Sequence, residues 1–131
     1  MSGMTELPQL LASMKPELME GEFVFCSVKG TLEAYMYLAP LATFIEAEGL
    51  TLVLTKAAAS EAGLAFEQCF KQLTLTVHSS LDAVGLTAAV ATKLTSKGIS
   101  ANVIAAYYHD HIFVPSRQGE QALLALKELT A

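Results

Sequence analysis

The sequence predicts an α+β protein in which an antiparallel sheet carries helices on one face. Short runs of β-branched and aromatic residues alternate with stretches of helical periodicity. In the second half of the chain the elements follow one another as strand, helix, strand, strand, helix, an order typical of an antiparallel sheet with helices on one side. With 131 residues, of which 53% are hydrophobic, the chain can build a core of ordinary size.

In the first half, apolar residues at helical spacing and a possible cap at Thr5 predict a helix that ends before Pro16 and Gly21. Residues 31–40 have no clear period, and both a loop and a short helix remain open there. The elements expected in this half are a helix over 5–14, a strand over 22–28, a hairpin over 42–54 turning at 47–49, and a short helix over 56–64.

In the second half, residues 70–77 alternate between apolar and polar, as in a strand covered on one face. A helix is expected to open at Asp82 and to end at Gly98. Its apolar stripe consists of Leu86, Ala89, Val90 and Leu94. Two strands over 101–108 and 111–114 and a last helix over 116–129, capped by Ser116, complete the prediction.

A weak internal repeat links the two halves. Residues 50–64 and 112–126 both run from a strand through a polar cap into a helix rich in Ala and Leu. We therefore expect two copies of one unit, a partly degenerate half over residues 1–68 and a second domain over residues 69–131. The first copy lacks a clear helix between its strands.

Charge and composition exclude several classes of partner. The chain has 13 acidic against 8 basic residues with no basic cluster, which argues against nucleic-acid binding. It lacks a signal peptide, an apolar run of about 20 residues and a basic amphipathic helix, so we expect a cytoplasmic protein without membrane contact. Cys26 and Cys69 lie in apolar runs and are expected to be buried thiols. The high apolar content favours a homodimer or a higher homo-oligomer.

The most specific pattern lies in residues 77–115. It contains an Asp-x-x-Gly-Leu turn at Asp82–Leu86, a helix closed by Lys97-Gly98-Ile99, and a strand that opens at Ser100 and leads into a tight hairpin. In these features the segment closely resembles an ACT domain, and it is most similar to the tandem ACT regulatory region of aspartate kinases. Residues 40–54 resemble the first half of a family of short stand-alone tandem ACT proteins of uncharacterised function.

The resemblance implies ferredoxin-like βαββαβ units in tandem that bind a regulatory ligand, often an amino acid, at the interface between paired units. In such proteins the ligand typically meets the turn between the first strand and its helix. Unlike the aspartate kinases, this sequence carries no attached catalytic domain. Mapped by the resemblance, the ligand-binding residues are Ser79, Ser80, Leu81, Asp82, Ala83, Val84, Gly85 and Leu86, with Asn102 and Val103 from the strand across the interface.

The chemistry of this turn is consistent with that role. A helix N-terminus presents unpaired amides that suit a carboxylate, and Gly85 allows a ligand to approach closely. Ser79 and Ser80 add donors, and Asp82 can cap the helix or accept from an ammonium group. The simpler alternative is that Asp82 only caps the helix and Gly85 only permits packing.

Two other functions remain open as alternatives. His109, Asp110 and His111, with His78, could hold a metal ion, or they could form an ordinary polar turn. His78, Ser79 and Asp110 supply the residue types of a catalytic triad, but no nucleophile elbow, phosphate-binding loop or zinc-protease motif is present. We therefore expect a non-catalytic regulatory module without a cofactor, which either binds an amino acid or acts as a ligand-free dimerisation module for a separate enzyme.

Overall fold

The computed structural model describes residues 6–76 and 85–130, which form two compact units. One, the inserted unit, spans Gly21–Phe70. The other, the split unit, combines the N-terminal residues up to Glu20 with the chain from Lys71 onward. The predicted division at residues 68 and 69 remains a prediction, because packing units of this kind do not define where a repeated domain begins.

The inserted unit is a three-stranded antiparallel sheet in the order β3-β4-β2. Cys26 pairs with Leu52, so alternate residues of both strands point to one face. That face carries the core, which includes Val24, Cys26 and Leu54. The crossover helix η1, which connects β2 to β3, and Ala59 of α2 pack against it. The elements are β2 (Phe23–Val28), the 3₁₀ helix η1 (Leu32–Leu38), β3 (Ala42–Glu46), β4 (Gly49–Thr55) and α2 (Lys56–Glu61).

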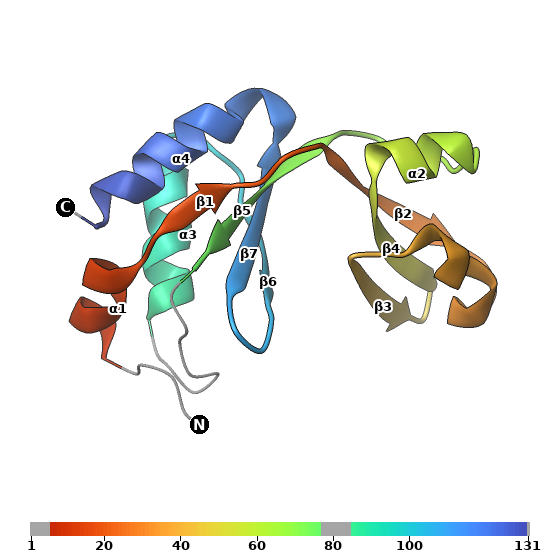
Figure 1. The fold of residues 1–131 in the computed structure, drawn as a ribbon, viewed down its shortest axis with the longest axis horizontal. Coiled ribbons are helices and arrows are strands. Elements are labelled where there is room, and N and C mark those ends of the chain that lie inside the picture. The colour runs from red at the N-terminus through yellow and green to blue at the C-terminus, as the bar shows by residue number, and fades with distance from the viewer. Residues whose placement is uncertain (1–5, 77–84, 131) are drawn as a thin grey trace. The chain divides into compact units, whose positions relative to one another are not determined.

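The split unit contains four strands in the order β1-β5-β7-β6 (Figure 1). Helices α1, α3 and α4 pack against the face of this sheet that carries Leu73, Ile112 and Val114. The elements are α1 (Leu7–Ser13), β1 (Pro16–Leu18), β5 (Phe70–Leu75), α3 (Leu86–Ser96), β6 (Asn102–Ala105), β7 (Asp110–Pro115), the 3₁₀ turn η2 (Ser116–Gln118) and α4 (Gly119–Glu128).

Helix α3 ends as the sequence predicts. The amide of Gly98 donates to the carbonyl of Thr95, and the amide of Ile99 donates to that of Leu94. This pair of bonds satisfies the last carbonyls of the helix, and it turns Ile99 into the core, where its side chain is 2% exposed. Helices α3 and α4 are further linked by Lys93 and Glu128, whose ammonium and carboxylate groups lie 2.5 Å apart.

Strand β1 was not predicted, since residues 16–21 were expected only to end the first helix. Its three residues pair antiparallel with β5, with Leu18 opposite Leu73. The amide of Met19 donates to the carbonyl of Gln72, and that of Thr76 donates to Lys15. The N-terminal strand therefore supplies the fourth strand that β5, β6 and β7 need to form a ferredoxin-like sheet.

The repeat predicted from the sequence is present. Each unit runs strand, helix, strand, strand, helix, and β4–α2 in the inserted unit corresponds to β7–α4 in the split unit. Residues 31–40, left open between loop and helix, contain η1, so the first copy does have a crossover helix. The α+β fold of two ferredoxin-like units in tandem is confirmed.

Three local expectations were wrong. Thr74 and Gln72 are each only 6% exposed, so β5 is buried on both faces and not on one. Ser116 does not cap the last helix, because no side-chain bond is made there and its hydroxyl is buried without a partner. Helix α3 was expected to open at Asp82, but it begins at Leu86 after Gly85.

In the described part of the chain, no helix has the length and apolarity that a membrane span requires.

Candidate functional site

Most of the predicted ligand-binding turn cannot be placed. Ser79–Val84, together with His78, lie outside the described residues, so the structure leaves their predicted role untested. The four remaining residues are Gly85 and Leu86 at the start of α3, and Asn102 and Val103 at the start of β6.

Two of these four residues belong to the core of the split unit. Leu86 is 3% exposed within the cluster that α3 shares with the sheet, and Val103 packs against that cluster. Asn102 is exposed, and its side-chain amide donates to the carbonyl of Phe113 on β7, 3.2 Å away. Packing in the core is sufficient to explain why positions 86 and 103 are apolar. That Leu86 and Val103 contact a ligand remains a prediction.

Gly85 has the structural role that the sequence analysis left open as the simpler alternative. It precedes α3 with φ +100°, a conformation that side chains of L-residues rarely adopt. A Cβ atom at this position would lie 3.1 Å from Cδ2 of Leu7. Gly85 and Leu7 also line an open groove of about 510 Å³ along α3. A larger residue at position 85 would therefore strain the fold, so it would not report on ligand binding alone.

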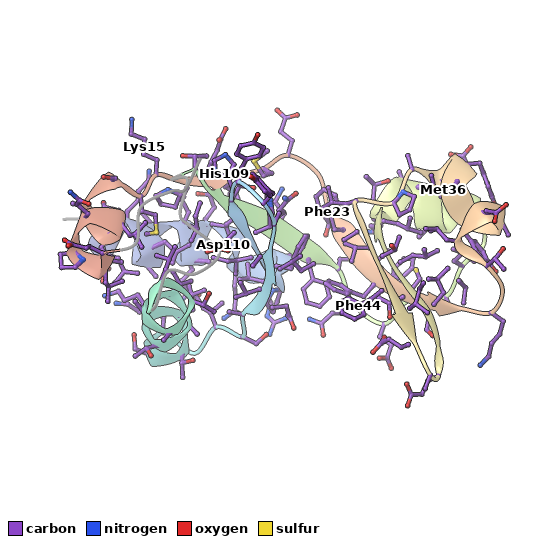
Figure 2. All side chains as sticks on the ribbon, turned by 90° about the horizontal axis from the view of Figure 1, so that it is seen from below. Lys15, Phe23, Met36, Phe44, His109 and Asp110 are labelled. Carbon is purple, nitrogen blue, oxygen red and sulfur yellow. The ribbon has the colours of Figure 1, made fainter. Side chains whose placement is uncertain are left out.

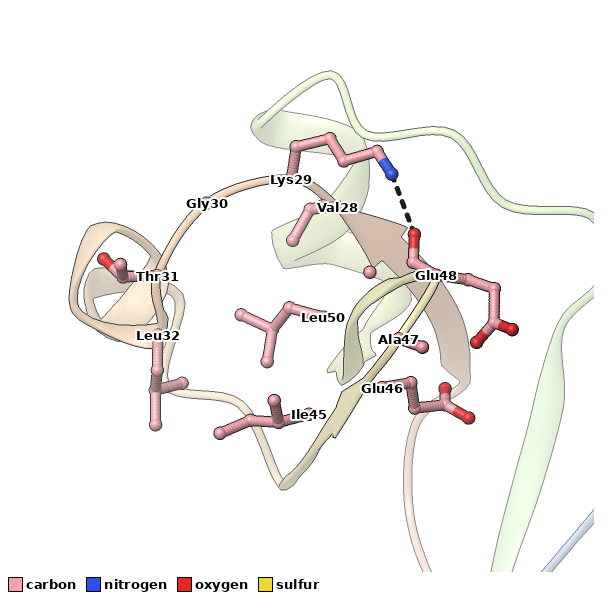
Figure 3. Close-up of a pocket in the computed structure, with 11 residues that line it drawn as sticks. Val28, Lys29, Gly30, Thr31, Leu32, Ile45, Glu46, Ala47, Glu48 and Leu50 are labelled. Carbon is pink, nitrogen blue, oxygen red and sulfur yellow. Dashed lines mark hydrogen bonds between the residues drawn. The ribbon is translucent and has the colours of Figure 1, made fainter.

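The equivalent turn in the inserted unit is fully described, and it borders a pocket of about 390 Å³ (Figure 3). Lys29, Gly30 and Thr31 connect the end of β2 to the start of η1. The β3–β4 hairpin, residues 45–50, forms the opposite wall. This volume falls in the lower part of the range of about 300 to 1,000 Å³ that small-molecule sites occupy.

The pocket exists because the crossover of the inserted unit is short. η1 is a seven-residue 3₁₀ helix without a buried residue, whereas a full α-helix would bury one stripe of side chains. Leu32, Tyr35 and Leu38 only partly cover the core. The end of the sheet beside Leu50 is therefore left with open space under the turn.

Hydrogen bonds fix the shape of the turn. The hydroxyl of Tyr35 donates to the carbonyl of Lys29 over 2.7 Å, which holds η1 against the turn. Gly30 takes φ +112°, so the chain can reverse between β2 and η1. The ammonium group of Lys29 donates to the backbone carbonyl of Glu48, 2.8 Å away, and so bridges the turn and the hairpin.

The polar and apolar groups of the pocket are separated. Figure 3 shows the side chains of Val28, Leu32, Ile45 and Leu50 on the side facing η1, with the Lys29 ammonium and the Glu48 carboxylate on the other. Such an arrangement suits a small molecule with a charged end and an apolar body.

The histidine cluster is described only in part, because His78 lies outside the described residues. His109 and Asp110 lie together at the start of β7 (Figure 2). His111 Nδ1 lies 3.1 Å from Gln72 Nε2 and 3.0 Å from Thr74 Oγ1. The Gln72 amide donates, so Nδ1 accepts and is not available as a ligand atom. Among the described residues, no group of three or more His, Cys, Asp or Glu is placed to hold a metal ion.

Burial sets the protonation of this cluster. It lowers the pKa of His111, and the nearby charge of His109 lowers it further. Burial also raises the pKa of Asp110, although both histidines act in the opposite direction. His111 is thus held neutral, consistent with a structural role between β5 and β7.

The two cysteines are free thiols, and of the two only Cys26 is buried as expected. Cys26 is buried on β2, and burial raises the pKa of its thiol, which disfavours the reactive thiolate. Cys69 is half-buried against the core of the inserted unit. Neither side chain lines the pocket.

Sequence reasoning missed the pocket because residues 31–40 showed no periodicity. One signal was present: Gly30 comes two positions after the predicted strand over 22–28, and Gly85 follows the strand over 70–77 at a greater distance. Because no helix was identified after Gly30, the sequence did not show that the first copy also has a turn between a strand and a helix.

Comparison with known proteins identifies both halves of the chain. Residues 2–71 match one model of the ACT domain, and residues 70–128 match another. A protein of unknown function from Vibrio cholerae, described as a possible transport protein, is 59% identical. The match covers 95% of this chain and 96% of that one, with a TM-score of 0.89. No curated protein matches the chain.

More distant structures share the fold. A protein from Agrobacterium tumefaciens has 15% identity and a TM-score of 0.74, with 89% of each chain covered. The ligand-free regulatory subunit of aspartate kinase from Thermus thermophilus has 10% identity and a TM-score of 0.64, with 92% of this chain and 99% of that one covered. The two matches to family models and the shared fold lead to one conclusion: the chain belongs to the ACT-domain family and carries two ACT domains in tandem.

Proposed function

We propose that this protein is a non-catalytic regulatory module that binds an amino acid at its strand-to-helix turns. The observation that carries the proposal is the pocket of about 390 Å³ beside Lys29–Thr31. It lies at the turn after the first strand of its unit, where the resemblance to ACT domains leads us to expect a ligand. Its size and its combination of charged and apolar groups fit a molecule as small as an amino acid.

The predicted turn Ser79–Leu86, with Asn102 and Val103, remains part of the proposal as a second site in the split unit. Two turns of the same kind would give two sites per chain. Pairing of units within one chain or between chains would complete them, in line with the predicted homodimer. The fold shared with an aspartate kinase regulatory subunit supports a regulatory role.

Calorimetry and thermal shift with the twenty protein amino acids test this function. A ligand that binds only the folded state raises its stability, by about 2.7 kcal/mol at a hundredfold excess over the Kd. We expect saturable binding that weakens at least tenfold in Lys29→Met, since this variant keeps the apolar stem and loses the charge that faces a carboxylate.

Lys56→Met is the matched control. Lys56 is an exposed lysine of the same unit that lies away from the pocket, and its contact with Glu22 at 3.7 Å contributes little stability. Equal loss of affinity in both variants would reject the pocket as the site. Binding of none of the twenty amino acids would reject the proposed function.

A ligand-free interaction module is the second candidate, and the exposed apolar side chains of the inserted unit favour it. Met36 on η1 and Phe44 on β3 are 57% and 70% exposed, and both are labelled in Figure 2. Tyr37, Leu41 and Ile45 are also exposed, at 50% to 82%. Light scattering after gel filtration tests it: Phe44→Glu should convert a dimer to monomers if the sheet face that carries Phe44 holds copies together.

A further inference from the structure

We infer that the pocket of the inserted unit selects an amino acid with an aliphatic side chain over one with a charged side chain. This inference rests on the proposed function and adds the class of ligand. It depends on three features of the pocket. These are a wall of apolar side chains of which one, Ile45, is exposed to solvent, a single cation, and a volume suited to a small molecule.

The apolar wall is built by strand register. Val28 pairs with Leu50 across β2 and β4, and Leu50 pairs with Ile45 across β4 and β3. Residues paired in this way point to the same face of a sheet. Val28 and Leu50 are 9% and 5% exposed, yet Ile45, in the same row, is 82% exposed. Ile45 is therefore a residue on the core face that nothing in the described chain covers.

An aliphatic ligand side chain would cover Ile45. Each buried methylene contributes about 0.8 kcal/mol, and a ligand lying between Leu32 and Ile45 removes apolar surface from water on both sides. A charged side chain placed there would lose part of its hydration without gaining a partner of opposite charge, which weakens binding. The wall therefore favours apolar side chains and opposes charged ones.

The charged groups of the pocket suit the backbone of an amino acid. Among the described residues that line it, Lys29 is the only cation. Its ammonium group donates one hydrogen bond to the Glu48 carbonyl and carries further N–H groups that can donate to a carboxylate. The Glu48 carboxylate lies on the same side as Lys29 but, like that of Glu46, points away from the apolar side chains (Figure 3), so the ligand ammonium would stay in contact with water.

An acidic or basic side chain would not find a second matched charge. With Lys29 engaged by the ligand carboxylate, an aspartate side chain has no other cation in the described lining. Glu46 accepts a hydrogen bond from the Thr51 hydroxyl and points away from the apolar wall, so a lysine side chain along the wall would not reach it.

A homologous series of ligands tests the inference by calorimetry on the full chain. Alanine, 2-aminobutyrate, norvaline and leucine share one backbone and differ in apolar length, while aspartate and lysine serve as charged comparators. We expect affinity to rise about fourfold for each methylene that becomes buried. Leucine should bind at least tenfold more tightly than alanine, and more tightly than aspartate or lysine.

Ile45→Ser locates the effect. Because Ile45 is 82% exposed, this change should leave the fold intact, which circular dichroism verifies. We expect leucine to bind about tenfold more weakly while alanine changes less than threefold. Leu124→Ser is the control, an exposed aliphatic residue on α4 that does not line the pocket and should leave both affinities unchanged.

The outcomes separate this inference from the proposed function. A flat series, or aspartate or lysine binding as tightly as leucine, would overturn aliphatic selectivity and leave amino-acid binding intact. Unchanged leucine affinity in Ile45→Ser would also overturn it, because the wall would then not touch the ligand. If no member of the series and none of the twenty amino acids binds, both proposals fail together.

Discussion

The two units of this protein have the same order of elements but use different crossover helices. In the split unit, α3 has eleven residues and buries Leu86, Val90 and Leu94 against the sheet. In the inserted unit, η1 has seven residues in 3₁₀ geometry and buries none. Among the described residues, the core clusters also differ in size, with thirteen buried residues in the split unit, three of them from α3, and seven in the inserted unit.

The difference suggests how one supersecondary unit provides both stability and a binding site. A 3₁₀ helix has about three residues per turn and runs along its partner with poorer packing than an α-helix. Its side chains at i and i+3 lie directly above one another, so Leu32, Tyr35 and Leu38 form one narrow row that covers the core only in part, and space is left at the end of the sheet. In the inserted unit that space is the pocket beside Lys29–Thr31.

The largest expected effect is on the free energy of unfolding, and it distinguishes the two crossover helices, α3 and η1. Leu94→Ala should lower the free energy of unfolding by about 3 kcal/mol, because it leaves a cavity in a closed core. Leu38→Ala, at the end of η1, should cost about 1 kcal/mol, since that side chain is only partly buried. Urea unfolding followed by circular dichroism measures both.

Leu124→Ala, on the exposed face of α4, is the control and should change stability by less than about 0.5 kcal/mol. Similar losses for Leu94 and Leu38 would contradict the comparison, because η1 would then pack as well as α3.

A smaller effect distinguishes the two glycine turns. Gly30→Ala and Gly85→Ala both place a Cβ atom on a backbone with positive φ, which costs about 1 to 2 kcal/mol. At Gly30 the new atom would lie 3.6 Å from the Tyr35 ring, an ordinary contact, whereas at Gly85 it would lie 3.1 Å from Leu7. We therefore expect Gly85→Ala to be the more destabilising variant in urea unfolding. The reverse order would mean that Leu7 moves aside at little cost.

The smallest expected effect is the pH dependence that His111 contributes. Burial lowers its pKa in the folded state from 6.5, so between the lowered value and 6.5 the unfolded chain binds more protons. The stability from neutral His111 is therefore complete above about pH 6.5 and is lost as the pH falls. Asp110, whose pKa is raised from 3.8, acts in the opposite sense at lower pH.

Unfolding of the wild type and of His111→Gln at pH 7.5, 6.5 and 5.5 isolates this contribution, because His109 and Asp110 are present in both proteins. The wild type should lose more stability than the variant as the pH falls. Parallel losses would show that His111 is not held neutral by its contacts with Gln72 and Thr74.

The sequence by itself determined the elements whose signals are local. The aromatic and β-branched run over residues 22–28 predicted β2, and the hairpin pattern over 42–54 with its turn at 47–49 predicted β3 and β4. The stripe of Leu86, Val90 and Leu94, followed by Gly98, predicted α3 and its end. The Asp-x-x-Gly-Leu turn and the repeat were sufficient to predict two ACT domains in tandem.

Only the tertiary structure decided the features that depend on distant partners. β1 has three residues, too few for a periodic signal, and it is a strand because β5 lies beside it. Thr74 and Gln72 are polar yet buried, because hydrogen bonds to His111 on β7 satisfy them. The pocket follows from the short η1 and from the register that places Ile45 beside Leu50. Long-range pairing and packing, which no local pattern encodes, determined each of these features.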